Sequence, residues 1–76
     1  MNTILPSTGP APDVVLTKAV RAAAGRLGLR NRRLAEVLGT SEASVSRLSV
    51  GRTIDPESKE GELALLFLRL FRSLDA

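Results

Sequence analysis

NRRLAEVLGTSEASVSRLSV, at residues 31–50, contains the pattern on which the fold of the chain depends. Its apolar or small residues are Leu34, Ala35, Leu38, Gly39, Val45 and Leu48. Those before the glycine fall on one face of a helix, and those after it fall on one face of a second helix. The glycine can adopt a positive φ, and the small side chain of Ala35 lets the helices approach closely. We therefore predict two short helices that are joined by a tight turn and cross at a steep angle.

The second of these helices has an exposed polar face. Ser41 is placed to cap it, because a serine hydroxyl can accept from the N–H groups that are free at a helix start. The positions that then point outward are Glu42, Ala43, Ser44, Ser46 and Arg47. A short helix presented behind a glycine turn is the arrangement of a DNA-reading helix-turn-helix. A plain helical hairpin without a nucleic-acid partner is the alternative.

Ser41 and the outward residues are therefore candidate DNA contacts, and two of them have a second interpretation. Arg47 can bond a guanine in the major groove, or it can hold a phosphate. Glu42 can accept from a cytosine amine, or it can stabilise the positive end of its own helix.

Positive charge is concentrated around the same stretch. Residues 14–52 carry eight cations and two anions, whereas residues 53–76 carry three cations and five anions. Seven of the eight cations are arginines, whose guanidinium groups suit phosphate oxygens. A basic block that includes such a motif indicates a polyanionic partner, and a solvated arginine-rich surface is the alternative.

The most basic point is the helix start at residues 30–33. Three arginines there oppose the positive end of the helix dipole, so a bound anion would stabilise this helix. Asn31 can cap the helix or meet a backbone phosphate, and Arg32 is a candidate contact beside it. Arg52 follows Gly51 at the other end of the motif and is placed to touch the DNA backbone.

The chain before the motif divides into a tail and a helix. Residues 1–12 contain three prolines and a glycine, and we interpret them as a flexible leader. Asp13 is expected to cap a helix that runs to about Leu27 and ends at Gly28. The apolar stripe of this helix comprises Leu16, Ala19, Val20, Ala23 and Leu27.

A long apolar helix is predicted over residues 55–76. Its first residues, Asp-Pro-Glu, supply a cap, a preset φ and a carboxylate near the positive helix end. Gly61 is expected to weaken its first turns. One side of the helix closes the core, and the remaining apolar surface is expected to form a homodimer. The seam assigned to the dimer comprises Leu63, Leu66, Phe67, Leu70, Phe71 and Leu74. Two-fold symmetry would place two reading helices ~34 Å apart, one turn of DNA.

The composition restricts other classes of function. The absence of cysteine and histidine excludes disulfides and thiolate metal sites and removes the commonest general base. No apolar stretch is long enough for a membrane span, and the first residues do not form a secretory signal. We therefore expect a cytoplasmic protein with no cofactor or metal. An enzyme is the weakest alternative, because no carboxylate is paired with a nucleophile in a recognisable motif.

Three segments resemble the Xre-type helix-turn-helix of bacterial regulators, and especially the N-terminal domain of the Xre/MbcA/ParS antitoxins. They read LTKAVRAAAGRLGL, RLAEVLGTSEASVSRLSVGR and DPESKEGELALLFLRLFRSLDA. The resemblance implies an all-α, four-helix domain over residues 13–76. Thr40 and Arg30 depart from the usual pattern, which has a larger aliphatic residue and a Ser or Thr cap at these positions.

The resemblance also implies a function. Such an antitoxin dimerises, binds the operator of its own operon and represses it. Relatives carry a further C-terminal domain that binds a RES-domain toxin, which depletes NAD in the cell. We expect that domain to be missing here, as in a piece cut from a longer protein, so that the chain binds DNA but neutralises toxin poorly or not at all. A helical dimerisation or protein-interaction module without DNA binding is the alternative.

Overall fold

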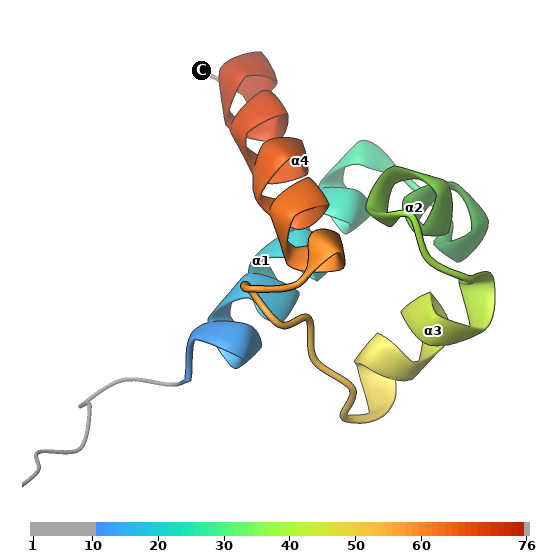
Figure 1. The fold of residues 1–76 in the computed structure, drawn as a ribbon. Helices are drawn as coiled ribbons and strands as arrows, with labels where there is room; N and C mark the ends of the chain where they lie inside the picture. The colour runs from blue at the N-terminus through green and yellow to red at the C-terminus, as the bar shows by residue number, and fades with distance from the viewer. Residues whose placement is uncertain (1–10, 76) are drawn as a thin grey trace, which may run out of the picture.

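The computed structural model describes residues 11–75, and these fold into an all-α domain, as predicted (Figure 1). The helices are α1 at Pro12–Leu27, α2 at Asn31–Leu38, α3 at Glu42–Arg47 and α4 at Lys59–Asp75. A 3-10 turn at Leu48–Val50 continues α3. No strand occurs within the described part of the chain. The leader predicted at residues 1–12 lies almost wholly outside it.

Glycines end α1 and α2 in the same way. Gly28 has a φ of 71° and Gly39 a φ of 69°, both in the left-handed region that favours glycine. In each case the N–H of the next residue, Leu29 or Thr40, donates to a carbonyl of the last helical turn at 2.9 Å. These bonds satisfy carbonyls that a helix end leaves free, and the predicted tight turns are confirmed.

The start of α1 differs from the prediction. Pro12 is the first helical residue and Ala11 occupies the cap position, so Asp13 does not cap the helix. Proline suits the first helical position because the N–H it lacks would have no partner there. Asp13 lies in the first turn, where its Oδ2 accepts from Thr53 Oγ1 at 2.7 Å.

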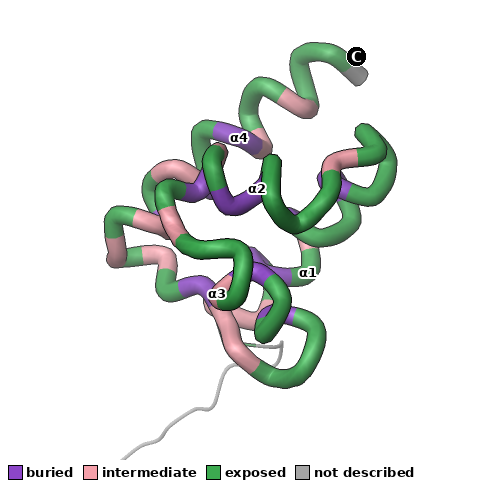
Figure 2. Tube along the Cα trace, turned by 90° about the vertical axis from the view of Figure 1, so that its right-hand side faces the viewer, coloured by how far each residue is buried: buried purple, intermediate pink, exposed green. Residues whose placement is uncertain are grey.

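The helices enclose one hydrophobic core (Figure 2). Its buried side chains are Leu16, Val20, Ala23, Ala24, Leu34, Ala35, Leu38, Val45, Leu48, Ile54, Ala64 and Phe67. The motif therefore packs as predicted. The stripe predicted for α1 is partly wrong, since Leu27 is 43 % exposed while Ala24 and Thr17 are buried. Leu27 lies in the last turn of α1, at the edge of the core.

The connection between α3 and α4 is fixed to α1. The N–H of Ile54 donates to Thr17 Oγ1 at 2.8 Å, and that hydroxyl donates to the carbonyl of Asp13 at 2.7 Å. Thr17 is buried, and these two bonds satisfy its hydroxyl. Because the Ile54 side chain is also fully buried, the connection is a packed part of the domain.

Helix α4 begins at Lys59, later than predicted. Asp55 Oδ1 accepts from the N–H of Glu57 at 2.9 Å, and the Asp55 carbonyl accepts from the N–H of Ser58 at 3.0 Å, so this segment forms a turn. Ser58 then supplies the cap, because its Oγ accepts from the N–H of Gly61 at 3.0 Å. The Asp-Pro-Glu sequence therefore marks the turn before the helix rather than its first residues.

The second half of α4 extends beyond the other helices (Figure 1), and its predicted seam is divided between two faces. Positions four apart share a face, whereas adjacent positions are about 100° apart around a helix. The inward face packs on the domain itself and comprises Leu63, Phe67 and Phe71. The outward face, 49–76 % exposed, comprises Leu66, Leu70 and Leu74. The seam predicted as one dimer contact therefore joins two faces, and its outward residues are the ones most exposed to a partner.

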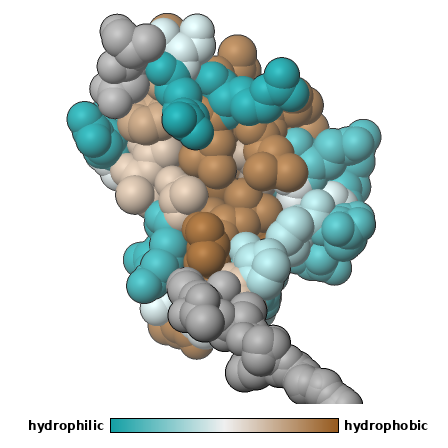
Figure 3. Space-filling view, turned by 90° about the vertical axis from the view of Figure 1, so that its left-hand side faces the viewer, coloured by the Kyte–Doolittle hydropathy of each residue, from teal (hydrophilic) through white to brown (hydrophobic). Residues whose placement is uncertain are grey.

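A second apolar surface lies between α1 and α4. Figure 3 shows apolar side chains gathered over the middle of this side of the molecule, with hydrophilic groups around them. A hollow on the surface is lined by Ala19, Ala23, Leu65, Leu68, Arg69, Phe71 and Arg72. Two arginines thus border an otherwise apolar hollow, which we name the α1–α4 hollow.

Candidate nucleic-acid interface

Helix α3 is held by its inner face and exposed on its outer face. Val45 and Leu48 are 4 % and 5 % exposed and pack in the core. The exposed residues of α3 are Glu42, Ala43, Ser46 and Arg47. Because Val45 and Leu48 are buried, the rotation of the helix about its own axis is fixed. Side chains at the exposed positions therefore point into solvent and can contact a ligand there.

Ser41 caps α3, as predicted. Its Oγ accepts from the N–H of Ser44 at 3.1 Å and donates to Ser44 Oγ at 3.0 Å. Ser44 is half-buried rather than outward-pointing. The hydroxyls of Ser41 and Ser44 are therefore both hydrogen-bonded at the start of the helix. Glu42 lies in the first turn, where a carboxylate stabilises the positive helix end.

Helix α3 is short. Its α-helical part ends at Arg47, and the N–H of Leu48 donates to the carbonyls of Val45 and Ser46 in the tighter 3-10 turn that follows. Beyond it, Ser49 donates its hydroxyl to the Ser46 carbonyl at 2.8 Å. Helix α3 therefore has only six residues, and four of them are exposed.

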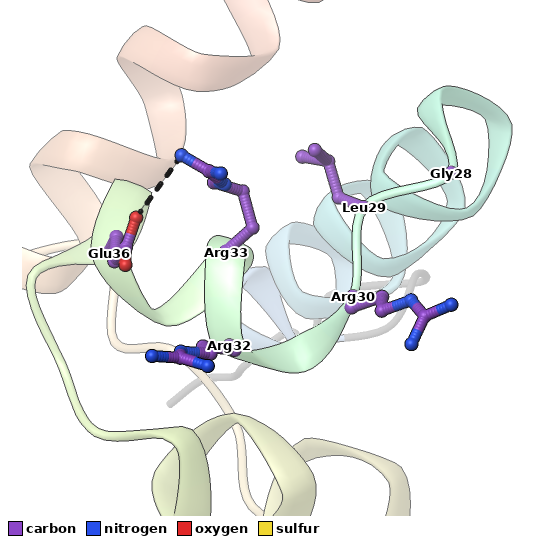
Figure 4. Close-up of a pocket in the computed structure, with 6 residues that line it drawn as sticks. All are labelled: Gly28, Leu29, Arg30, Arg32, Arg33 and Glu36. Atoms are coloured by element: carbon purple, nitrogen blue, oxygen red, sulfur yellow. Dashed lines mark ion pairs between the residues drawn. The ribbon is translucent and has the colours of Figure 1, made fainter.

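The start of α2 lies in a basic hollow lined by Gly28, Leu29, Arg30, Arg32, Arg33 and Glu36. Arg30 occupies the cap position, its side chain makes no capping bond, and Asn31 is the first helical residue rather than the cap. Figure 4 shows Arg33 turned towards Glu36, with Arg30 and Arg32 extending away from that pair on opposite sides. The Arg33–Glu36 contact is 3.5 Å long and solvent-exposed, so it holds Arg33 only weakly.

A second polar hollow connects α1, α2 and the end of α3. Its polar members are Arg21, Asn31, Ser46 and Ser49, and its floor includes Leu34, Val45 and Leu48. Two predicted contacts, Asn31 and Ser46, thus line one crevice. Arg21 was not among the predicted contacts, although its position off the apolar stripe of α1 placed it on the surface.

Arg52 is placed differently from the prediction. Its Nη2 donates to Glu60 Oε1 at 2.7 Å, its Nη1 donates to Glu60 Oε2 at 3.2 Å, and the two side chains are 31 % and 14 % exposed. A phosphate that approached this guanidinium would have to compete with a paired carboxylate. The sequence did not indicate this pair, because eight residues and a turn separate its members.

Other kinds of site find no support in the described residues. Residues 11–75 contain no group of three or more carboxylate, histidine or cysteine side chains that could hold a metal ion. The helices formed by these residues are all too short or too polar to cross a membrane.

Comparison with known proteins gives one match. Residues 9–69 match the model of a family described as the antitoxin Xre-like helix-turn-helix domain. No curated protein matches the chain. The match covers most of the 76 residues and includes α1, α2, α3 and the greater part of α4. The chain therefore belongs to the antitoxin Xre-like helix-turn-helix family, a family of DNA-binding regulators, as the sequence resemblance predicted.

Proposed function

We propose that this chain is the sequence-specific DNA-binding domain of an antitoxin that binds the operator of its own operon and represses it. The observation that carries this proposal is the presentation of α3. Val45 and Leu48 fix the helix from behind, so that Ser46 and Arg47 face outward beside the basic start of α2. The family supports DNA binding in a toxin–antitoxin context.

In this proposal the start of α2 holds the DNA backbone. Its N–H groups receive no side-chain cap, and Arg30 and Arg32 extend on opposite sides of this helix start. Backbone N–H groups at a helix start and guanidinium groups are both common phosphate ligands. Asn31 and Arg21 line the adjoining hollow and add a donor amide and a cation. These contacts fix the orientation of the domain on the duplex without reading its sequence.

The exposed face of α3 then reads base edges in the major groove. Arg47 can form a bidentate contact with guanine, the commonest specific contact of arginine. Ser46 can bond to several base edges, and Ala43 can contact a thymine methyl group. Glu42, which lies in the first turn of α3, can accept from a cytosine amine.

We also propose that the operator is bound by a homodimer. Leu66, Leu70 and Leu74 form an exposed apolar row along the outward face of α4. Packing of this row against its copy would remove it from water and relate two α3 helices by two-fold symmetry. In a longer form of the protein, a RES-domain toxin would be the further partner.

The test is a fluorescence-anisotropy titration with the region upstream of its own gene and with a scrambled duplex of equal length. We expect tighter binding to the upstream region and a steep fall in affinity with salt, because phosphate contacts release counterions. Equal affinity for both duplexes, or affinity that salt does not change, would contradict the proposal.

A protein-interaction module without DNA binding is the second candidate. The apolar surfaces of α4, namely the row Leu66, Leu70 and Leu74 and the α1–α4 hollow, favour it. In that case self-association would persist while the upstream duplex and the scrambled duplex both failed to bind. The same titration, run beside a sedimentation measurement, separates the two candidates.

A further inference from the structure

Arg52 closes the end of the α3 unit with two different donors. Its backbone N–H donates to the carbonyl of Arg47 at 3.0 Å, across Gly51, which has a φ of 116°. Its Nη1 donates to the carbonyl of Ser44 at 3.4 Å. Both acceptors lie in the last turn of α3, where a helix end leaves carbonyls free. The guanidinium charge also complements the negative end of the helix dipole.

Glu60 holds the guanidinium in this position. The Arg52–Glu60 pair is bidentate and partly shielded from water, with side chains 31 % and 14 % exposed. Two other ion pairs among the described residues, Arg33–Glu36 and Lys59–Glu62, have side chains at least 62 % exposed. A shielded bidentate pair keeps a fixed geometry, whereas exposed pairs contribute little.

Helix α3 depends on such contacts. It has only six residues, and an isolated helix of that length does not persist in water. Ser41 caps its start, and at its end the side chains of Ser49 and Arg52 donate to the carbonyls of Ser46 and Ser44. Since Glu60 lies in the first turn of α4, the guanidinium connects the end of α3 to the start of α4.

We propose that Arg52 is a positioning residue for DNA reading rather than a phosphate contact, and that Glu60 is its anchor. Arg52 acts through the carbonyl of Ser44 and fixes the angle at which α3 is presented. This inference rests on the proposed function, in which α3 reads DNA. It assigns to Glu60, an anion near a DNA-binding surface, a favourable effect on specific binding.

The two possible roles of Arg52 predict opposite effects of Glu60→Gln. If Arg52 were a phosphate contact, this substitution would release its guanidinium, remove a repelling charge and tighten binding. If Arg52 positions α3, the same substitution weakens specific binding by about fivefold, the change that corresponds to loss of one helix cap. Glu62→Gln is the matched control, because it removes the same charge from the same helix at an exposed pair.

Binding is measured by anisotropy over a salt series, with a duplex selected from a random pool by the wild-type protein and with a scrambled duplex. We expect Arg52→Gln, Arg52→Lys and Glu60→Gln to lose affinity for the selected duplex alone. Lysine keeps the charge that a phosphate needs but not the fork that Glu60 and Ser44 need. The slope of log K against log [salt] should stay at the wild-type value in Arg52→Gln. A slope smaller by about 0.9, equal to one lost phosphate contact, overturns the inference, as does tighter binding by Glu60→Gln.

Amide hydrogen exchange without DNA provides the readout that does not depend on the proposed function. Faster exchange at Val45 and Arg47 is expected in Arg52→Lys and Glu60→Gln, with wild-type exchange in Glu62→Gln and at the buried Val20 in all variants. Wild-type exchange throughout α3 in the first two variants overturns the positioning role, whether or not the protein binds DNA. Failure of the wild-type protein to select any duplex counts against the proposed function alone.

Discussion

Two glycines inside helices have opposite surroundings. A Cβ at Gly61 would lie 2.7 Å from the Cα of Pro56 and 2.8 Å from its carbonyl carbon, whereas a Cβ at Gly25 would have no atom within 4 Å. The sequence indicated only that Gly61 weakens its helix. The close approach of the turn before α4 is a tertiary feature, and a propensity argument cannot detect it.

Alanine substitution should therefore change stability in opposite directions at these two positions. Gly61→Ala is expected to lower the free energy of unfolding by about 1–3 kcal/mol, because backbone atoms must move to admit the methyl group. Gly25→Ala is expected to raise it by about 0.4–1 kcal/mol, since alanine restricts the unfolded chain and favours the helix. Urea denaturation measures both, and a stabilised Gly61→Ala protein would contradict the packing described for the start of α4.

Arg47 is the arginine on the exposed face of α3, so its removal tests base reading. Arg47→Ala is expected to cost about 1–3 kcal/mol of binding free energy on a selected duplex and much less on a scrambled one. The matched control is Arg33→Ala, which removes an exposed arginine that is turned towards Glu36. Equal losses on the two duplexes would show that Arg47 holds a phosphate instead.

At the scale of elements, a helix boundary was predicted correctly where adjacent residues determine it. The ends of α1 and α2 depend on Gly28 and Gly39, and the start of α3 depends on Ser41, so each is determined by a few adjacent residues. The predicted starts of α1 and α4 were wrong because several residues that favour a helix start lie close together there. Pro12, which suits the first helical position, competes with the capping residue Asp13, and Ser58 competes with Asp55 as a cap. Local sequence does not indicate which one caps the helix once the chain is packed.

At the scale of elements, the Ser41 cap at the start of α3 predicts how stability changes when the cap is removed. Ser41→Ala is expected to lower the free energy of unfolding by about 1 kcal/mol, because the N–H of Ser44 loses its acceptor. Ser46→Ala removes an exposed hydroxyl from the middle of the same helix, where alanine has the higher helix propensity, so stability should be unchanged or slightly raised. Thermal unfolding followed by circular dichroism compares the two, and equal midpoints would contradict the capping role.

At the scale of the whole molecule, the candidate site was only partly predictable. The outward residues of α3 and the basic start of α2 follow from helical spacing, because both lie within one continuous motif. The engagement of Arg52 with Glu60, the division of the α4 seam and the position of Arg21 beside Asn31 did not follow. Each depends on how separate helices lie against one another, which no single segment encodes.

The outward row of α4 gives a prediction about assembly. Leu70→Glu is expected to convert a dimer into monomers and to weaken operator binding, because it places a charge in the proposed apolar contact. Leu65→Glu introduces the same charge beside the α1–α4 hollow and should leave the dimer intact. Sedimentation with and without DNA measures the mass in each case. A dimer lost in Leu65→Glu but kept in Leu70→Glu would move the interface to the hollow.

The free end of α4 and the exposed face of α3 lie on well-separated parts of the domain (Figure 1). If α3 reads the operator and the end of α4 forms the dimer, as proposed, substitutions that redirect α3 to a new operator would leave the dimer contact unchanged, and the reverse would also hold. After gene duplication, two copies of such a regulator would then diverge in target sequence while their subunits still mixed, and the resulting heterodimers would recognise asymmetric operators that neither parent binds well. Separation of the two surfaces would thus let regulatory circuits branch without first losing the ability to assemble.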